Sequence, residues 1–290
     1  MSRTVSSLVT VLVCCGAAYL ALAQNPAPIV GQWTVSGPVV QDRVQLSVQR
    51  NSTGSHMNSS SPVQFAQLRG LTRAQLESTG SVARFELVRD AGTFHFEGYL
   101  QNGGGGGTFT FTSNPNFEAE MRSLGYGSAL SDEKVFTMAI HDVSAAYVRE
   151  MQSLGIRPSS TDQLITMRIH NVTTDFVKDF KGLGYTDLTP DKLVTMRIHG
   201  VSPDFARELK SLGYESVSPD QMVTMRIHNA STDFIKEVEA LGYNRPAIDQ
   251  LVTMRIHNVS PEFIRKTRTL GMGNLSIDQL VSMRIHGIVE

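Results

Sequence analysis

Leu193-Val-Thr-Met-Arg-Ile-His199 is one copy of a seven-residue stretch that recurs along the C-terminal part of the chain. Close copies occupy residues 164–170, 222–228 and 251–257, and altered copies lie at 135–141 and 281–286. Equivalent residues are about 29 positions apart, as His170 and His199 are. A fixed period of this size indicates stacked structural units. The sequence therefore predicts six tandem units between residues 114 and 290.

Each unit carries start and stop signals for two short helices. In one unit, Ser202 can cap a first helix, and Pro203 suits its first turn. Leu212-Gly213-Tyr214 is typical of a helix end in which glycine adopts the left-handed conformation. Ser218 and Gln221 then form the capping box of a second helix. Helices of about eight to eleven residues are unstable alone. Stacking must therefore stabilise them, and we expect an αα-hairpin solenoid.

The segment 24–113 has a different hydrophobic period. Apolar and polar residues alternate at 44–48, 83–87, 93–97 and 108–112, which is typical of half-buried antiparallel strands. The serine-rich segment 55–61 and the glycine run 103–107 predict loops, the latter between two strands. The fold class is therefore α+β, with a small antiparallel β domain at 24–113 followed by the helical repeat domain at 114–290.

The first 23 residues are typical of a secretory signal peptide. Arg3 precedes an apolar run that ends in a small-x-small cleavage pattern at Ala23. We expect cleavage there and a periplasmic or secreted protein that meets the membrane only during export. A retained membrane anchor is the alternative. Both cysteines, Cys14 and Cys15, lie in this segment, so disulfides and thiol chemistry are not expected in the exported chain.

Composition and motifs argue against nucleic-acid binding and catalysis. The chain has 26 basic and 27 acidic residues and a formal net charge of -1, without the basic surface of nucleic-acid binders. His-Glu-x-x-His and Gly-x-Ser-x-Gly motifs are absent from the sequence. Ser131-Asp-Glu-Lys134 matches a Ser-x-x-Lys motif, but sister units carry helix caps at this position. We therefore expect a non-enzymatic protein without a cofactor or a metal.

Six of the eight histidines occupy one position of the repeat, namely His141, His170, His199, His228, His257 and His286. A regular stack would hold them about 10 Å apart, too far for two imidazoles to share a zinc ion. Each lies in the last turn of a predicted helix, where it helps satisfy terminal carbonyl groups. We expect a structural role; a pH-sensitive ladder and a metal site are the alternatives.

Five arginines recur two positions before the histidines, at Arg168, Arg197, Arg226, Arg255 and Arg284, and Ala139 takes this place in the first unit. On a helical wheel the arginine falls inside the apolar arc with Val194, Met196 and Ile198. A partly buried guanidinium needs a partner. The acids at the starts of the first helices are the predicted partners, across units: Asp175, Asp204, Asp233 and Glu262. An anion-binding stripe is the alternative.

Trp33 is the one tryptophan of the chain. Gly31-Gln32-Trp33 is similar to the Gly-x-Trp opening of lipocalin-type barrels, although the β segment is short for an eight-stranded barrel. We interpret Trp33 as the largest core residue of a small sheet. The alternative is that it marks a pocket for an apolar ligand.

The sequence resembles a known bacterial module. Residues 90–98, the glycine run, 107–111 and the repeats together are similar to the extracytoplasmic tail of Bla/Mec-type sensor metallopeptidases, which are membrane antirepressors. The resemblance covers about Val82 to Glu290. The protease region and its zinc-binding motif are absent here, so no catalytic residue carries over. The resemblance implies an extracytoplasmic regulatory or binding role.

The sequence as a whole predicts an exported interaction or regulatory module with a protein partner. Repeat stacks present long surfaces that commonly bind other proteins. The alternatives are a small-ligand-binding protein that uses the β domain, and an accessory to a membrane sensor protease. The sequence does not identify the partner, the pathway or the oligomeric state.

Overall fold

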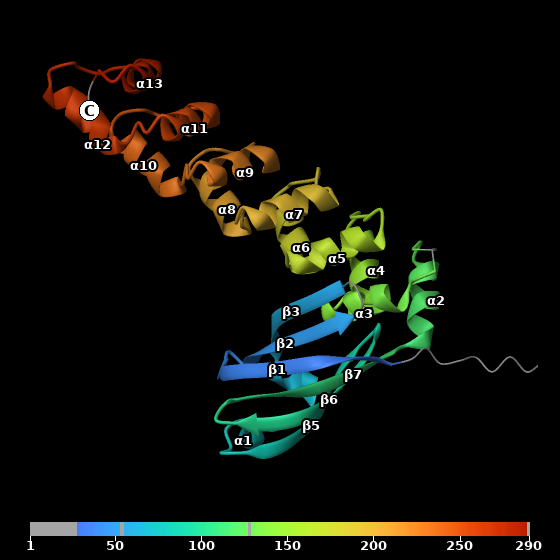
Figure 1. Ribbon diagram of the computed structural model, residues 1–290. Coiled ribbons are helices and arrows are strands. Elements are labelled where there is room, and N and C mark those ends of the chain that lie inside the picture. The colour runs from blue at the N-terminus through green and yellow to red at the C-terminus, as the bar shows by residue number, and fades with distance from the viewer. Residues whose placement is uncertain (1–27, 53–54, 127–128, 289–290) are drawn as a thin grey trace, which may run out of the picture.

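The protein is built from a curled sheet followed by a long stack of short helices (Figure 1). The structure is a computed structural model that describes residues 28–52, 55–126 and 129–288. The predicted α+β fold class with a helical repeat region is confirmed. The predicted signal peptide at 1–23 lies outside the described residues.

The sheet has seven strands in the order β3-β2-β1-β7-β6-β5-β4, and the paired strands are antiparallel. Their bounds are β1 Ile29–Val40, β2 Arg43–Ser52, β3 Ser55–Gln64, β4 Leu68–Arg69, β5 Ser81–Arg89, β6 Gly92–Gln101 and β7 Gly104–Ser113. The alternating segments predicted as strands lie in β2, β5, β6 and β7, and each of these segments buries every second residue. One helical turn, α1 (Arg73–Leu76), packs beside β5 and β6.

Two loop predictions were wrong. The serine-rich segment 55–61 belongs to β3, which pairs with β2 along its whole length. The glycine run continues β7 from Gly104, and the turn before it is made by Asn102 and Gly103, both with positive φ. Strand β6 lies so close that a Cβ on Gly107 would lie 2.1 Å from the Glu97 carbonyl oxygen. Glycine is therefore required there by the strand and not by a loop.

Aromatic side chains fill the inner face of the sheet. The ring centroids of Trp33 and Phe85 are 5.0 Å apart, and those of Phe94 and Phe111 are 4.8 Å apart. Phe136 of α3 (Asp132–Ile140) joins this cluster, with its centroid 5.3 Å from that of Phe111. The second helix of the first repeat unit therefore shares a core with the sheet.

Twelve helices of nine residues each form the stack within the described residues. The first helices of the units are α2 Pro115–Ser123, α4 Ala145–Ser153, α6 Thr174–Gly182, α8 Pro203–Ser211, α10 Thr232–Ala240 and α12 Pro261–Thr269. The second helices are α3, α5 Thr161–Ile169, α7 Pro190–Ile198, α9 Pro219–Ile227, α11 Ile248–Ile256 and α13 Ile277–Ile285. First helices contact first helices of the next unit, and second helices contact second helices. The result is two layers (Figure 1).

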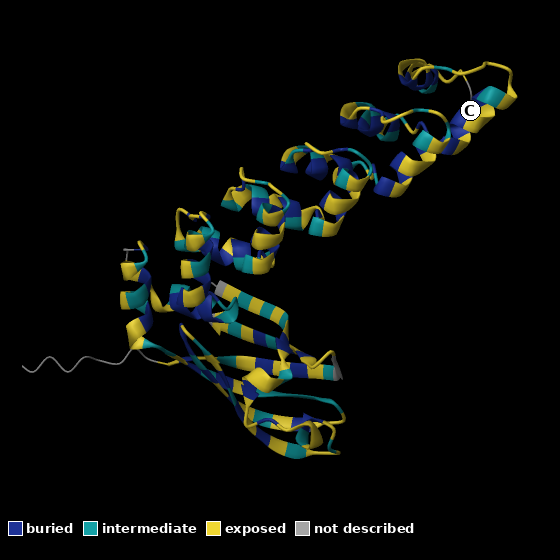
Figure 2. Cartoon of the chain, turned by 180° about the vertical axis from the view of Figure 1, so that it is seen from behind, coloured by how far each residue is buried: buried dark blue, intermediate teal, exposed yellow. Residues whose placement is uncertain are grey.

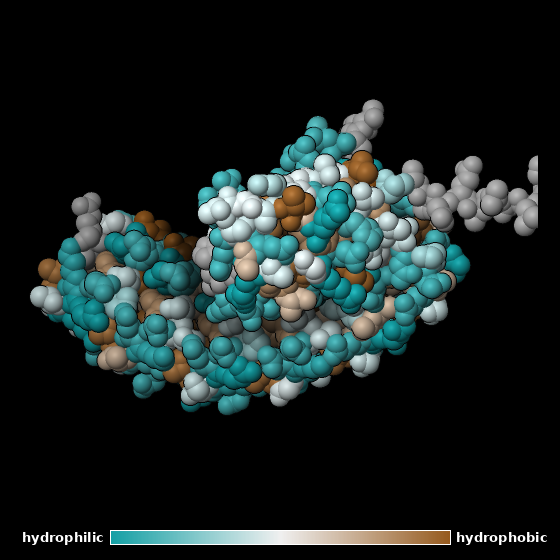
Figure 3. All heavy atoms as spheres, turned by 90° about the horizontal axis from the view of Figure 1, so that it is seen from below, coloured by the Kyte–Doolittle hydropathy of each residue, from teal (hydrophilic) through white to brown (hydrophobic). Residues whose placement is uncertain are grey.

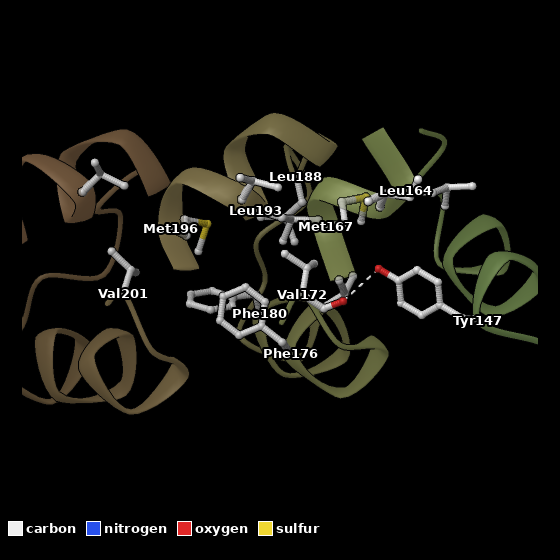
Figure 4. Packing of buried hydrophobic residues seen from close by; sticks show 14 of the residues in the cluster. Tyr147, Leu164, Met167, Val172, Phe176, Phe180, Leu188, Leu193, Met196 and Val201 are labelled. Atoms are coloured by element: carbon white, nitrogen blue, oxygen red, sulfur yellow. Dashed lines mark hydrogen bonds between the residues drawn. The ribbon is translucent and has the colours of Figure 1, made fainter. Parts of the chain in front are cut away.

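Each helix buries the side that faces the other layer (Figure 2). In α7 the buried residues are Leu193, Val194 and Met196, and α6 contributes Phe176 and Phe180. Figure 4 shows this packing and its continuation into the neighbouring units. Because every unit repeats these positions, the core runs along the whole stack.

The predicted helix signals are confirmed. The Ser202 hydroxyl accepts a hydrogen bond from the Phe205 amide, and Ser218 and Gln221 form a capping box. Gly213 has a φ of +84°, and the Tyr214 amide donates to the Leu209 carbonyl at 3.0 Å. The helices therefore begin and end where capping chemistry predicts.

Tyrosines at the ends of first helices link neighbouring units. The Tyr126, Tyr214 and Tyr243 hydroxyls donate to the carbonyls of Pro158, Pro246 and Leu275, just before the second helix of the next unit. Burial raises the pKa of Tyr214 to about 12, so this hydroxyl stays protonated. The equivalent Tyr185 hydroxyl is buried and has no hydrogen-bond partner among the described residues.

This difference predicts opposite effects of one substitution. Tyr214→Phe should lower the free energy of unfolding by about 1 kcal/mol, because the Pro246 carbonyl loses its donor. Tyr185→Phe should be neutral or stabilising, because it removes a buried hydroxyl without a partner. Urea unfolding followed by circular dichroism measures both variants. Equal destabilisation by the two substitutions would contradict the assignment.

Candidate functional site

The five arginines of the repeat form a ladder that joins neighbouring units. Each guanidinium Nε donates to a backbone carbonyl at the end of the second helix of the preceding unit. The N–O distances lie between 3.0 Å, for Arg226 to Gly200, and 3.5 Å, for Arg255 to His228. A cation at a helix C-terminus is favourable because the last carbonyl groups lack partners within the helix.

Each arginine also stacks on an aromatic ring of its own unit. The guanidinium carbon lies 5.0 Å from the ring centroid of Tyr147 for Arg168 and 4.4 Å from that of Phe205 for Arg226. Arg197, Arg255 and Arg284 lie over Phe176, Phe234 and Phe263 in the same way. The guanidinium is thus sandwiched between a first helix and the preceding unit, and its contacts are a carbonyl oxygen and a π face.

The predicted carboxylate partners of this ladder were wrong. Asp175, Asp204, Asp233 and Glu262 pair instead with a cation three residues later on their own helix. In the part of the chain that the structure describes, the first rung alone has a carboxylate, since Arg168 also donates to Asp142 at 3.1 Å. Stacking on an aromatic ring compensates for the partial burial of the guanidinium. The prediction from the sequence considered charge alone and did not include such stacking.

The histidines lie at the ends of the second helices, as predicted, but within the described residues only the His286 ring makes the expected hydrogen bond to a terminal carbonyl group. Each is the residue at which the helix stops, and its amide donates to the carbonyl four residues earlier. The backbone carbonyls of His141, His170 and His228 accept hydrogen bonds from the arginine ladder. The Nδ1 atom of the His286 ring donates to the Ser282 carbonyl oxygen at 2.8 Å. Among the described residues, no group of three or more His, Cys, Asp or Glu side chains could hold a metal ion.

The residue between the arginine and the histidine forms an exposed apolar stripe. Its members are more than half exposed: Ile169 at 52 %, Ile198 at 55 %, Ile227 at 54 %, Ile256 at 53 % and Ile285 at 58 %. We call these five residues the isoleucine stripe. On the face of the molecule shown in Figure 3, hydrophobic residues are mostly scattered among hydrophilic ones, which is ordinary for a protein surface. The stripe differs because it repeats one residue at one position.

The sequence prediction missed this stripe. The wheel placed Ile198 inside the apolar arc, but the buried arc ends at Val194, and Ile198 lies about 40° beyond it. The signal that could have revealed the stripe was its position at the edge of the arc, where packing does not require isoleucine. The corresponding residue of the first unit, Ile140, is partly buried and lines a small cavity with Leu46, Val48 and Phe94 of the sheet.

Trp33 lies in the core of the sheet, as expected from the sequence. Its side chain is 1 % exposed, and its indole N–H donates to the Glu97 carbonyl at 3.1 Å. The cavity on the inner face has a volume of only about 20 Å³, close to the space of one water molecule. The aromatic side chains and α3 fill the rest of the interior.

Charged residues that the sequence prediction missed connect the sheet to the stack. The Asp142 carboxylate forms ion pairs with Arg89 of β5, at 3.2 Å, and with Arg168 of α5, at 3.1 Å. Burial lowers the pKa of Arg89, although the carboxylate of Asp142 opposes this shift. Arg50 of β2 pairs with Glu133 of α3. These pairs lie between elements far apart in sequence, so spacing along the chain gave no sign of them.

The arginine ladder predicts a stability effect. Arg226→Met should lower the free energy of unfolding by about 1 kcal/mol, because the Gly200 carbonyl loses a donor and Phe205 loses the stacked cation. Arg207→Met is the matched control, because Arg207 is exposed and forms only surface ion pairs, and its effect should stay within about 0.5 kcal/mol. Urea titration measures both, and equal losses would refute the structural role of the ladder.

The histidine at the junction predicts a pH effect. Burial, reinforced by the nearby Arg168, lowers the pKa of His141. The unfolded chain then binds a proton more readily than the folded chain, so stability falls as the pH drops below about 6.5. His141→Gln should reduce this fall, measured as the urea midpoint at about pH 7.5 and about pH 5.5. The exposed His199→Gln serves as the control, and identical pH dependence of wild type and H141Q would contradict the prediction.

The described residues include no helix long and apolar enough to cross a membrane. No family model matches the chain, and neither the curated proteins nor the solved structures include a significant match. The resemblance to the tail of sensor metallopeptidases therefore stays a prediction.

Proposed function

We propose that the chain is a non-enzymatic, exported protein-interaction module whose contact surface is the isoleucine stripe. The observation that carries this proposal is the exposure of the same apolar side chain in five successive units. The fold buries about half of each isoleucine side chain, and the exposed half contributes nothing to the stability of the isolated chain. Burial against a partner gives the repeated isoleucine a physical reason.

The energy available from the stripe requires a partner that spans several units. Full burial of an isoleucine contributes about 1.5–3 kcal/mol, and about half of that remains to be gained at a half-exposed site. Five rungs then contribute about 5 kcal/mol, which is comparable with the lower estimates of the entropy cost of association. Contact with one or two units would be too weak.

The neighbouring charges indicate the chemistry of the partner. Arg197, Arg226, Arg255 and Arg284 use Nε for the ladder, and their terminal nitrogens make no hydrogen bond to the part of the chain that the structure describes. These donors flank the stripe and suit carboxylates. A protein surface with apolar side chains bordered by acidic ones is therefore the partner that we propose.

The first unit supports this proposal from within the chain. Ile140 occupies the position of the stripe, and the β domain covers it with Leu46, Val48 and Phe94. At this one rung, the chain itself supplies an apolar surface of the kind that we propose for a partner. Arg89 borders that contact, as polar groups border most interfaces.

The proposed location is outside the cytoplasm, and it rests on the sequence pattern of residues 1–23 and on the resemblance to sensor-metallopeptidase tails. The same resemblance supports a role as an accessory to a membrane sensor protease as a narrower form of the proposal. A membrane receptor domain with an acidic rim would then be the partner.

A triple variant tests the stripe. Ile198→Ser, Ile227→Ser and Ile256→Ser together should leave the helical signal unchanged and abolish specific capture of partner proteins from a cell-envelope extract. The control combines Lys178→Ser, Arg207→Ser and Lys236→Ser, which removes side chains of similar exposure from the first helices of the corresponding units. Quantitative mass spectrometry should find proteins retained by wild type and control and lost by the isoleucine variant. Equal capture by all three would reject the stripe as the contact surface.

A further inference from the structure

A second surface lies on the β domain, away from the buried aromatic face. The outer face of β3, β2, β1 and β7 carries a groove with a volume of about 690 Å³, which is within the usual range of ligand sites. The side chains that line it are hydroxyls and amides, chiefly Gln32, Thr34, Ser47, Gln49, Asn58 and Thr108. We call this surface the polar groove.

Strand register arranges these side chains in two rows. Ser60, Ser47, Thr34 and Gly106 lie side by side across four strands, and Asn58, Gln49, Gln32 and Thr108 form the next row. Paired residues of antiparallel strands point to the same face. The groove therefore presents a regular array of donors and acceptors.

Most of this hydrogen-bonding capacity is unused by the protein. Ser47 and Ser60 bond to each other at 2.7 Å, and Gln45 donates to Ser60. The side chains of Gln32, Thr34, Gln49, Asn58 and Thr108 make no hydrogen bond to the described part of the chain. A neutral amide supplies two donors and an acceptor, and a hydroxyl supplies both functions. The array therefore suits a ligand that is itself dense in hydroxyl groups.

The floor of the groove contains Gly106. A Cβ on Gly106 would lie 3.0 Å from the Trp33 carbonyl oxygen and 3.4 Å from the Thr34 Cγ2 atom. These contacts are tight, although less severe than the 2.1 Å contact expected at Gly107. Gly106 therefore keeps the groove open between Thr34 and the neighbouring strand β6.

An aromatic ring stands on the other side of this gap. Tyr99 is the register partner of Gly106 on β6 and is 55 % exposed. Its ring is held beside Gly80, whose added Cβ would meet the Tyr99 hydroxyl at 2.8 Å. An exposed tyrosine offers an apolar face with a polar edge. Tyr99 does not line the groove itself. It lies one strand beyond it in the row of Thr34 and Gly106, so a ligand that extends along this row reaches the Tyr99 ring.

We propose that the polar groove binds a neutral oligosaccharide. A sugar ring has one face of C–H groups, which suits Tyr99, and an edge of hydroxyls, which suits Thr34, Gln32 and Gln49. The residues lining the groove carry no charge, and the adjacent Glu97 is paired with Arg84, so an ionic ligand finds no counter-charge. This site is separate from the isoleucine stripe and does not depend on the function proposed for the repeats.

Calorimetric titration of the full chain with cellohexaose, maltohexaose and chitohexaose tests the proposal, with oligogalacturonate as the charged comparison. At least one neutral hexasaccharide should bind, and oligogalacturonate should not. Tyr99→Ala, at an exposed position, and Gly106→Val, which fills the floor of the groove, should each weaken binding at least about tenfold, which corresponds to about 1.4 kcal/mol. Glu86→Gln on the same sheet, outside the groove, is the control and should bind as wild type does.

Three results would overturn the proposal. These are no binding of any neutral hexasaccharide by the folded wild-type chain, equal binding of oligogalacturonate, and unchanged affinity in both groove variants. Circular dichroism of Y99A and G106V separates lost binding from lost folding. Because Y99A removes only an exposed ring, it keeps the test decisive if G106V unfolds. The isoleucine variant should bind the sugar as wild type does, so the proposal for the groove and the proposal for the stripe are tested independently.

Discussion

The repeat region depends on one interaction, in which each unit supplies hydrogen-bond donors to the helix ends of the unit before it. A helix of nine residues leaves its last carbonyl groups unpaired and is unstable alone. The arginine ladder serves the ends of the second helices. At the ends of first helices, Gln152 donates to the Leu124 carbonyl at 2.8 Å and Lys210 to the Leu183 carbonyl at 2.6 Å. No unit is therefore complete by itself, and the stack is stabilised by nearest-neighbour contacts.

This interaction also explains why the isoleucines are exposed. The arginine must lie between its own first helix and the preceding unit, which fixes the rotation of every second helix. The next residue then lies about 100° further round the helix, past the buried arc that Val194 closes in α7. Geometry thus accounts for the exposed position in each unit, but it does not require isoleucine there. The fold therefore accounts for the buried half of each isoleucine and not for the exposed half, which is why the stripe is informative about binding.

Local chemistry was predictable from the sequence, and contacts between distant segments were not. Caps such as Ser202 and Ser218, the stop at Gly213, and strands such as 93–97 followed from signals within a few residues. The loop prediction for the glycine run was wrong because the close approach of β6 to Gly107 is a tertiary contact that the local sequence does not reveal. The loop prediction for β3 was wrong because a polar strand at the edge of a sheet lacks the alternation of apolar and polar residues. The predicted carboxylate partner of Arg226 was wrong because a carbonyl oxygen and an aromatic ring can satisfy a guanidinium without any carboxylate. The positions of the repeated arginines and histidines were thus predicted from the sequence, whereas their contacts and the isoleucine stripe required the structure.

The first unit departs from the repeat where it meets the sheet, and its departures fit together. Ala139 replaces the arginine and is buried, so no guanidinium has to be accommodated against the aromatic cluster around Phe136. Asp142 replaces the asparagine or glycine of other units at the same left-handed position, and its carboxylate pairs with Arg89 of the sheet as well as Arg168. The carboxylate that the sequence led us to expect on every rung occurs on this rung alone, because only here does a second, buried cation face the helix end. The sheet therefore takes the place of a preceding unit, and it covers Ile140 because a terminal unit would otherwise leave its side of the core open.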